Sequence, residues 1–384
     1  MSRSWDVFCR VIDNFGDAAV CWRLARQLAD EHGGQVRLWI DALPALHALC
    51  PEVNADCAKQ VVSGVTVLSW TANAEFGAPA DIVIDAFGGG LPETYVDAMA
   101  DRKPHPVWVI LEYLSAESWV AAHHGLPSPH PRLPLGRYFF FPGVVPGTGG
   151  VLREASLEES RQAFENSPAA HVKFWRDLGY PPPAASDVAV SLFGYENPGA
   201  AALMQIWAEG RDKVVAALPR SRLRPQVCGF FGAADPGDGA TLVKGSLEVR
   251  FLPFLPQPVY DGLLWACDLN FVRGEDSFVR AQWARRSLVW HIYPQQESAH
   301  RIKLDAFLQA YCTGMEPGLA AALQSLWHGW NAPAPGAGQL HAAWETLGQA
   351  RDQMRKHAQA WAVRLALAGD LAGNLAQYCE ERLK

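Results

Sequence analysis

Residues 5–32 read WDVFCRVIDNFGDAAVCWRLARQLADEH and contain both the first strand and the first helix that the sequence predicts. The apolar run at 5–11 is typical of a buried strand. Within 17–32, Val20, Leu24 and Leu28 recur at the spacing of one helix face. A buried strand that leads directly into an amphipathic helix is the first half of a βαβ unit, so this stretch predicts an α/β fold.

The same alternation continues along the chain on both sides of an expected linker. Strand-like runs follow at 36–40, 65–70, 82–87 and 107–111. A Gly/Pro-rich text begins near 143, and we expect the interdomain linker between about 150 and 186. A second α/β series follows it. We expect its strands at 188–193, 226–231, 247–251, 269–272 and 288–292, and its helices at 200–218, 259–267, from Ser277 onward and after 338.

A chain of 384 residues predicts two domains, at roughly 150 residues per domain. We expect an N-terminal Rossmann-like domain in 1–165 and a C-terminal Rossmann-like domain in 186–350. Residues 351–384 are expected to form a C-terminal helix that packs back on the N-terminal domain. Ligands of open α/β sheets bind beyond the carboxyl ends of the strands, so two such sheets predict an interdomain cleft.

The composition excludes several classes of function. Apolar residues make up 49% of the chain and charged residues 19%, which is typical of a globular protein. A net charge of -7 argues against a nucleic-acid partner, because phosphate binding requires a basic excess. The eight cysteines include no CxxC pair, and no cluster has metal-ligand spacing, so we expect no metal. Without a signal-like start or an apolar run of about 18 residues, we expect a cytoplasmic protein with no membrane partner.

The first candidate site is the sequence DNFGD at 13–17, between the first strand and the first helix. A Rossmann fold binds phosphate at this position, but GxGxxG is absent and two carboxylates would repel an anion. Asp13 and Asp17 therefore suit a general base or an acceptor-binding role. The structural alternative is that Asp17 caps the helix and Asp13 forms a turn.

The second candidate site is FVRGEDS at 271–277, where another predicted strand runs into a helix. Arg273 has the fork geometry that binds a diphosphate, and the backbone N–H groups near Asp276 and Ser277 favour the same anion. Glu275 suits hydrogen bonds from sugar or ribose hydroxyls. The alternative is a capped helix with an arginine–carboxylate pair.

Aromatic residues at the ends of predicted strands form a third candidate site. Phe193 and Tyr195 follow one strand, and Phe254 with Gln257 follows another, which suits a nucleobase pocket. Packing in the core explains these aromatics equally well. His291, in WHIYPQ, has no evident triad partner, and we assign it no catalytic role.

Together, these segments resemble the protein-arginine rhamnosyltransferases that modify bacterial elongation factor P. The resemblance rests on FCRVIDNFGDAAVCWRLARQL at 8–28, CDLNFVRGEDSFVRAQWA at 267–284 and WHIYPQ at 290–295, and it extends to YFFFPG and to the segment 149–154. These segments occur in the same order over most of the chain. One departure is FGGGLP at 87–92, where a bulkier and more polar loop is expected in the family.

The resemblance implies a GT-B fold, in which two Rossmann-like domains flank a cleft and the C-terminal domain holds the donor. It implies TDP-β-L-rhamnose as the donor and an arginine of elongation factor P as the acceptor. It also implies inversion at the anomeric carbon without a metal, and activation of the acceptor for translation.

The resemblance also implies roles for individual residues. Asp17 would act on the acceptor guanidinium with Asp13 supporting it, and Glu275 would complete the catalytic set. The donor contacts would be Arg273, Glu275, Asp276 and Ser277 for the diphosphate and sugar, and Phe193, Tyr195, Phe254 and Gln257 for the nucleotide. From the residues alone, two other classes stay open: another nucleotide-sugar enzyme with a small-molecule acceptor or epimerase activity, and a non-catalytic nucleotide-binding protein.

Overall fold

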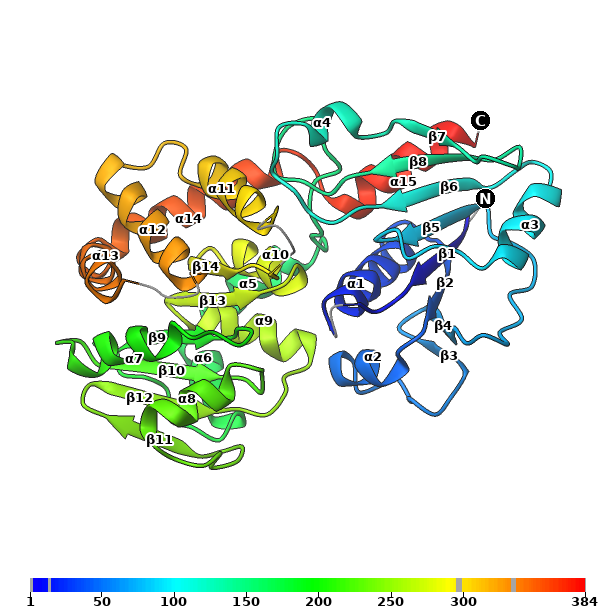
Figure 1. Cartoon of the computed structure of the whole chain (residues 1–384). Coiled ribbons are helices and arrows are strands. Elements are labelled where there is room, and N and C mark those ends of the chain that lie inside the picture. Colours follow the sequence, from blue (N-terminus) through cyan, green and yellow to red (C-terminus); the bar gives the residue numbers. More distant parts are fainter. Residues whose placement is uncertain (1–2, 13–14, 295–298, 333–335, 384) are drawn as a thin grey trace. The chain divides into compact units, whose positions relative to one another are not determined.

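The computed structural model describes residues 3–12, 15–294, 299–332 and 336–383. The chain divides into two compact units, each built around its own sheet (Figure 1). The first unit contains Met1–Ala155 and Arg364–Lys384, and the second contains Ser156–Val363. Among the described residues, no helix is both long and apolar enough to cross a membrane.

The sheet of the first unit contains eight strands within the described residues: β1 (Ser4–Cys9), β2 (Gln35–Ile40), β3 (Lys59–Val62), β4 (Val65–Ser69), β5 (Ile82–Ala86), β6 (Val107–Leu111), β7 (Pro127–Pro129) and β8 (Gly136–Phe140). Their spatial order is β3-β4-β2-β1-β5-β6-β8-β7. The inner strands are parallel, and the edge strands β3 and β7 are antiparallel to their neighbours. The strands β5 and β6 are buried along their whole length, as expected of a sheet covered on both faces.

The helices of the first unit are α1 (Gly16–Asp30), α2 (Leu43–Leu49), α3 (Glu93–Asp101), α4 (Val120–His123) and α15 (Leu371–Arg382). Although it lies at the end of the chain, α15 packs on α1. Asp370 caps α15 by accepting from the Gly373 N–H (2.9 Å), and it also accepts from Gln27 of α1 (2.9 Å). This pairing fixes the C-terminal helix on the first unit.

A buried carboxylate anchors the amino half of β1. Asp6 is fully buried, and Arg37 donates to both of its oxygens through Nε (2.6 Å) and Nη2 (2.5 Å). Trp39 Nε1 (3.1 Å), the Ala80 N–H (3.1 Å) and the Tyr95 hydroxyl donate to the same carboxylate. A charge inside the sheet is tolerated because these donors replace the lost water.

The sheet of the second unit contains six strands within the described residues: β9 (Val188–Leu192), β10 (Val214–Leu218), β11 (Thr241–Lys244), β12 (Leu247–Phe251), β13 (Leu269–Arg273) and β14 (Ser287–His291). Their order is β11-β12-β10-β9-β13-β14, and only β11 is antiparallel to its neighbour. The run β12-β10-β9-β13-β14 repeats the order β4-β2-β1-β5-β6 of the first unit. The prediction of two Rossmann-like α/β folds is therefore confirmed.

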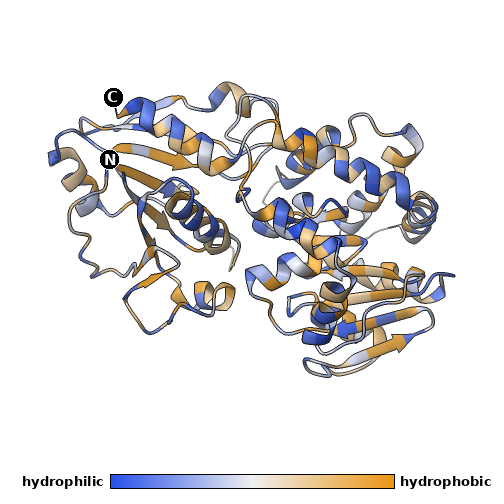
Figure 2. Cartoon of the chain, turned by 180° about the vertical axis from the view of Figure 1, so that it is seen from behind, coloured by the Kyte–Doolittle hydropathy of each residue, from blue (hydrophilic) through white to orange (hydrophobic). Residues whose placement is uncertain are grey.

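The helices of the second unit surround this sheet, and the strands at the centre of both sheets are strongly hydrophobic (Figure 2). The bounds are α5 (Leu157–Glu165), α6 (Pro168–Asp177), α7 (Ala200–Glu209), α8 (Arg224–Phe231), α9 (Gln257–Ala266), α10 (Asp276–Trp283), α11 (Ala299–Tyr311), α12 (Pro317–Trp330), α13 (Ala337–Gln349) and α14 (Arg351–Ala366).

Two expected elements of the second unit are wrong. The expected helix 200–218 is shorter, because α7 ends at Glu209 and Gly210 at its C-cap has an extended backbone. The apolar run 214–218 forms the buried strand β10 instead. The expected strand 226–231 lies instead in α8. Its sequence carries helix signals, with a proline in the first turn and Gly232 in the left-handed conformation (φ 64°) at the C-terminus.

The boundaries of the units also differ from those expected. The first unit ends at Ala155 rather than at 165, because α5 packs on α6 and α9 of the second unit. The expected linker 150–186 accordingly contains two helices. The second unit extends to Val363, and the chain then returns to the first unit. The expected interdomain cleft stays a prediction.

A buried carboxylate of the first unit generates a prediction about pH. Asp85, in β5, is 5% exposed, and its carboxylate accepts from the Gly90 N–H (3.1 Å). Burial is the main cause that raises its pKa to about 6. The unfolded chain has a lower pKa, near 4. The folded state therefore binds the proton more tightly, and this group's stabilisation is lost as the pH rises from about 4 to 6.

We expect Asp85→Asn to be more stable than the wild type at pH 8, by about 1–3 kcal/mol, because the amide removes the buried charge. The gain should shrink as the pH is lowered from 8 to 4.5, as measured by urea denaturation. Asp81→Asn is the control. Burial opposes ionisation of Asp81, but hydrogen bonds from Ser4 and Arg102 lower its pKa, so this variant should lose stability at pH 8. A pH-independent gain for Asp85→Asn would contradict this account.

Candidate functional site

Both candidate sites lie where the order of the strands reverses. In the first unit the reversal is between β1 and β5, and in the second it is between β9 and β13. Open α/β sheets bind ligands at the carboxyl edge beside such a reversal. Asp17 follows β1, and Arg273 ends β13, so each unit places a charged residue at this point.

Asp17 is held through both of its carboxylate oxygens. It lies in the first turn of α1 and is 2% exposed. Its Oδ2 accepts from the Ile12 N–H (2.7 Å), and its Oδ1 accepts from the Tyr113 hydroxyl (3.2 Å). Phe15, not Asp17, occupies the N-cap position of α1. The carboxylate is therefore fixed by the ends of β1 and β6, while Asp13 lies outside the described residues.

Sequence reasoning missed Tyr113. This residue comes two positions after β6, whereas Asp17 follows β1, and the two are 96 positions apart in the chain. The available signal was that the predicted strand at 107–111 ends at the same sheet edge as the strand before Asp17.

In the second unit, the structure brings three predicted residues together. Arg273 is 8% exposed at the end of β13. Its guanidinium carbon lies 4.6 Å from the ring centroid of Phe193 and 4.7 Å from that of Tyr195. Both aromatics follow β9, the neighbouring strand. The two rings contact the cation and hold it at the switch point, the place where the order of the strands reverses.

The loop from β13 to α10 is closed by its own side chains. The Arg273 N–H donates to Ser277 Oγ (3.0 Å), and the Ser277 hydroxyl donates to the Arg273 carbonyl. Asp276 is buried in the first turn of α10, and Gln257 donates to it (3.4 Å). Glu275 occupies the N-cap position. Ser277 therefore shapes the loop, and Gln257 and Asp276 are neighbours.

The structure also describes Phe254, which was predicted to contact the nucleotide, and His291, to which no catalytic role was assigned. Phe254 is half-buried in the segment between β12 and α9, three residues before Gln257. His291 ends β14 beside Arg273, and its Nδ1 accepts from the Tyr195 N–H (3.2 Å). Burial, with a smaller effect from Arg273, lowers the pKa of His291 to about 4, so the imidazole is neutral. His291 thus fixes the Tyr195 backbone, a role that the sequence did not reveal.

The arrangement around Arg273 suits an anion. The guanidinium carries a permanent positive charge. The first N–H groups of α10 add the partial positive charge of a helix N-terminus. A phosphate group placed here would gain charge-assisted hydrogen bonds from both sources. Within the described residues, no group of three or more His, Cys, Asp or Glu side chains is arranged to hold a metal.

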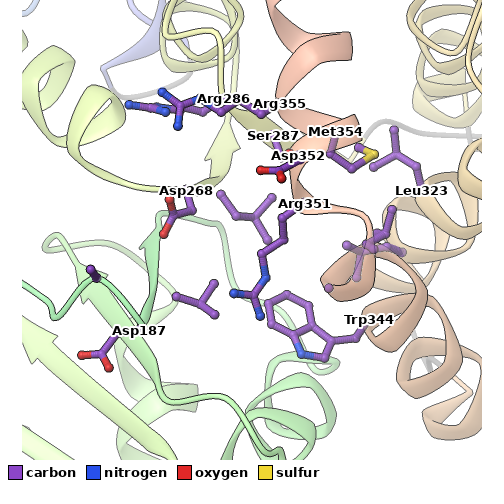
Figure 3. Close-up of a pocket in the computed structure, with 16 residues that line it drawn as sticks. Asp187, Asp268, Arg286, Ser287, Leu323, Trp344, Arg351, Asp352, Met354 and Arg355 are labelled. Atoms are coloured by element: carbon purple, nitrogen blue, oxygen red, sulfur yellow. The ribbon is translucent and has the colours of Figure 1, made fainter. Parts of the chain in front are cut away.

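A cavity of about 250 Å³ lies at the opposite edge of the second sheet (Figure 3). Its wall includes Val188, Leu269 and Ser287, which begin β9, β13 and β14. Two of its arginines are paired within the protein: Arg286 with Glu165 (3.1 Å), and Arg351 with Asp212. We do not assign this cavity to the site at Arg273, because that site lies at the carboxyl end of β13.

Comparison with known proteins identifies the family. Residues 5–380 match the family described as "Elongation-Factor P (EF-P) rhamnosyltransferase EarP". A protein-arginine rhamnosyltransferase of Pseudomonas aeruginosa is 44% identical, over 98% of each chain. One from Neisseria meningitidis serogroup B is 35% identical, over 92% of this chain and 91% of the relative.

Solved structures support the same assignment. A structure described as the structural basis for EarP-mediated arginine glycosylation of translation elongation factor EF-P matches with a TM-score of 0.71 and 31% identity, over 99% of each chain. A glycosyltransferase from Rickettsia africae, 10% identical with a TM-score of 0.54, shares the fold over 100% of this chain and 99% of its own. The chain therefore has the fold of GT-B glycosyltransferases, and it belongs to the EarP family of EF-P rhamnosyltransferases.

Proposed function

We propose that the chain transfers L-rhamnose from TDP-β-L-rhamnose to an arginine side chain of elongation factor P, with inversion at the anomeric carbon, and thereby activates this factor for translation. The observation that carries the proposal is the charge placed at each switch point. The first unit holds a buried carboxylate, Asp17, and the second holds a buried guanidinium, Arg273. A cationic acceptor and an anionic donor require these opposite charges.

The donor is assigned to the second unit. Arg273 and the N-terminus of α10 would bind the diphosphate, since both attract anions. Glu275, at the N-cap of α10, would accept hydrogen bonds from hydroxyls of the sugar or ribose. The remaining predicted contacts with the nucleotide are Asp276, Ser277, Phe193, Tyr195, Phe254 and Gln257.

The acceptor is assigned to the first unit, where Asp17 would act as the base. A guanidinium has a pKa above about 12, so a carboxylate does not deprotonate it in the ground state. Asp17 instead orients the guanidinium by a charge-assisted hydrogen bond, with Asp13 in support. As the guanidinium nitrogen bonds to the anomeric carbon, the bond from that carbon to the diphosphate oxygen breaks. The proton passes to Asp17, and its transfer coincides with formation of the new bond.

Positively charged groups of the protein would stabilise the negative charge that develops on the departing TDP. Arg273 and the first N–H groups of α10 are fixed before the reaction, and preorganised donors stabilise charge without reorganisation. Stabilisation of the leaving group by these donors would make a metal unnecessary. The absence of a metal from the reaction stays a prediction. A small-molecule acceptor or an epimerase activity finds less support, because two relatives with 44% identity are named protein-arginine rhamnosyltransferases.

We expect Asp17→Asn to lower the rate of transfer by about 10²–10⁴-fold, because the amide keeps the shape of the side chain but does not accept the proton. Binding of TDP, measured by calorimetry, should stay unchanged, since Asp17 belongs to the first unit. If the variant keeps more than half of the wild-type rate, Asp17 is a structural residue of α1 and the proposed base is elsewhere.

We expect Arg273→Ala to weaken binding of TDP by roughly 10–100-fold, which corresponds to about 1.5–3 kcal/mol for a hydrogen-bonded charged group. Isothermal calorimetry with TDP measures this change. Arg220→Ala is the control, because Arg220 is exposed in the same unit and pairs with Asp238 (2.6 Å). Equal affinities of the Arg273 variant and the wild type would move the diphosphate site away from α10.

A third prediction concerns the acceptor. Arginine is common on protein surfaces, so selectivity for one protein requires contacts away from the reacting group. We expect a short peptide that copies the acceptor loop to be modified at least 10-fold more slowly than the intact acceptor domain. The measurement is the mass gain of one deoxyhexose for both acceptors at equal concentration. Comparable rates would show that recognition is local to the arginine and its immediate neighbours.

A further inference from the structure

The loop after β5 is connected to Asp17 through one aromatic pair. Tyr113 donates its hydroxyl proton to Asp17 Oδ1 (3.2 Å). Its ring stacks on Phe87, with ring centroids 4.4 Å apart and planes inclined by 15°. Tyr113, which follows β6, therefore contacts both Asp17, which follows β1, and Phe87, which follows β5.

The backbone at Phe87 is held in a costly conformation. Phe87 has φ 60°, in the left-handed region, which costs a residue with a side chain roughly 1–2 kcal/mol. The Phe87 N–H donates to the Leu111 carbonyl (2.6 Å), and Asp85 accepts from the Gly90 N–H (3.1 Å). These bonds tie the loop to the ends of β5 and β6. Such strain persists where the surrounding structure imposes it, and it is enriched at functional sites.

The left-handed conformation at Phe87 coincides with a stack of two aromatic rings. It accompanies a buried Phe87 side chain (8% exposed) whose ring packs face to face on Tyr113. Tyr113 is only half-buried, so this stack limits the rotation of its ring. A restrained ring keeps the hydroxyl within reach of Asp17.

We propose that Tyr113 is a positioning residue for the transfer reaction, and that the strained Phe87 loop holds it in place. This inference rests on the proposed role of Asp17 as the base. With Ile12 N–H fixing Oδ2 and the Tyr113 hydroxyl fixing Oδ1, the plane of the carboxylate is set before the acceptor binds. A base that is already oriented loses less entropy when the guanidinium arrives.

The hydroxyl and the ring of Tyr113 have separable roles. Tyr113→Phe keeps the ring that stacks on Phe87 and removes only the donor to Asp17. A residue that served packing alone would tolerate this change. A positioning residue would lose rate without losing affinity for the donor, which is assigned to the other unit.

We expect Tyr113→Phe to lower kcat by about 10-fold or more, since hydrogen bonds to charged groups are stronger than neutral ones. The KM for the donor and the affinity for TDP should stay within 2-fold of the wild type. Tyr138→Phe, the same change on β8 of the same unit, is the control and should keep the wild-type kcat. A Tyr113→Phe enzyme with wild-type kcat would overturn the proposal.

A double-mutant cycle with Asp17→Asn tests whether Tyr113 acts through Asp17. In single-turnover transfer measured by mass spectrometry, we expect Tyr113→Phe to change the residual rate of the Asp17→Asn enzyme by less than 2-fold. An equal fold-loss in both backgrounds would overturn the positioning role and leave Asp17 as the base. If Asp17→Asn alone keeps more than half of the wild-type rate, the proposed function of Asp17 fails instead. The two failures are therefore distinguishable.

Discussion

The reversal of strand order beside β1 and beside β9 is the constraint on which both sites depend. At a reversal, the connections from two neighbouring strands pass to opposite faces of the sheet, which leaves their loops apart at the carboxyl edge. Each unit buries a charged side chain at this place, Asp17 in the first and Arg273 in the second. Because the two sheets repeat one order of strands, the proposed function would use the same architecture for a cationic substrate in one unit and an anionic substrate in the other.

Asp17 and Arg273 are both buried, and neighbours of different kinds surround the two charges. Asp17 is compensated by donors, one from the backbone and one from Tyr113. Arg273 is compensated by the π faces of Phe193 and Tyr195. Asp6, a carboxylate inside the same sheet as β1, forms an ion pair with Arg37.

The sequence predicted the α/β class, the strand β1 and the helix α1, because long apolar periodicities reveal buried elements. The prediction placed the strand β10 in a helix and placed most of the helix α8 in a strand. A short apolar run fits both a strand and a helix until its neighbours are known. Arg273 and its aromatic partners were found as loop residues after predicted strands. Tyr113 and the role of His291 were not, because both depend on which strands lie side by side, and a single sequence does not specify that order.

The most direct test of the account is transfer itself. The purified chain, incubated with TDP-β-L-rhamnose and elongation factor P, should add the mass of one deoxyhexose to the acceptor. Peptide mapping should place that mass on one arginine, and NMR of the product should show the inverted α-linkage. No mass gain, a gain on a residue other than arginine, or a retained β-linkage would contradict the account.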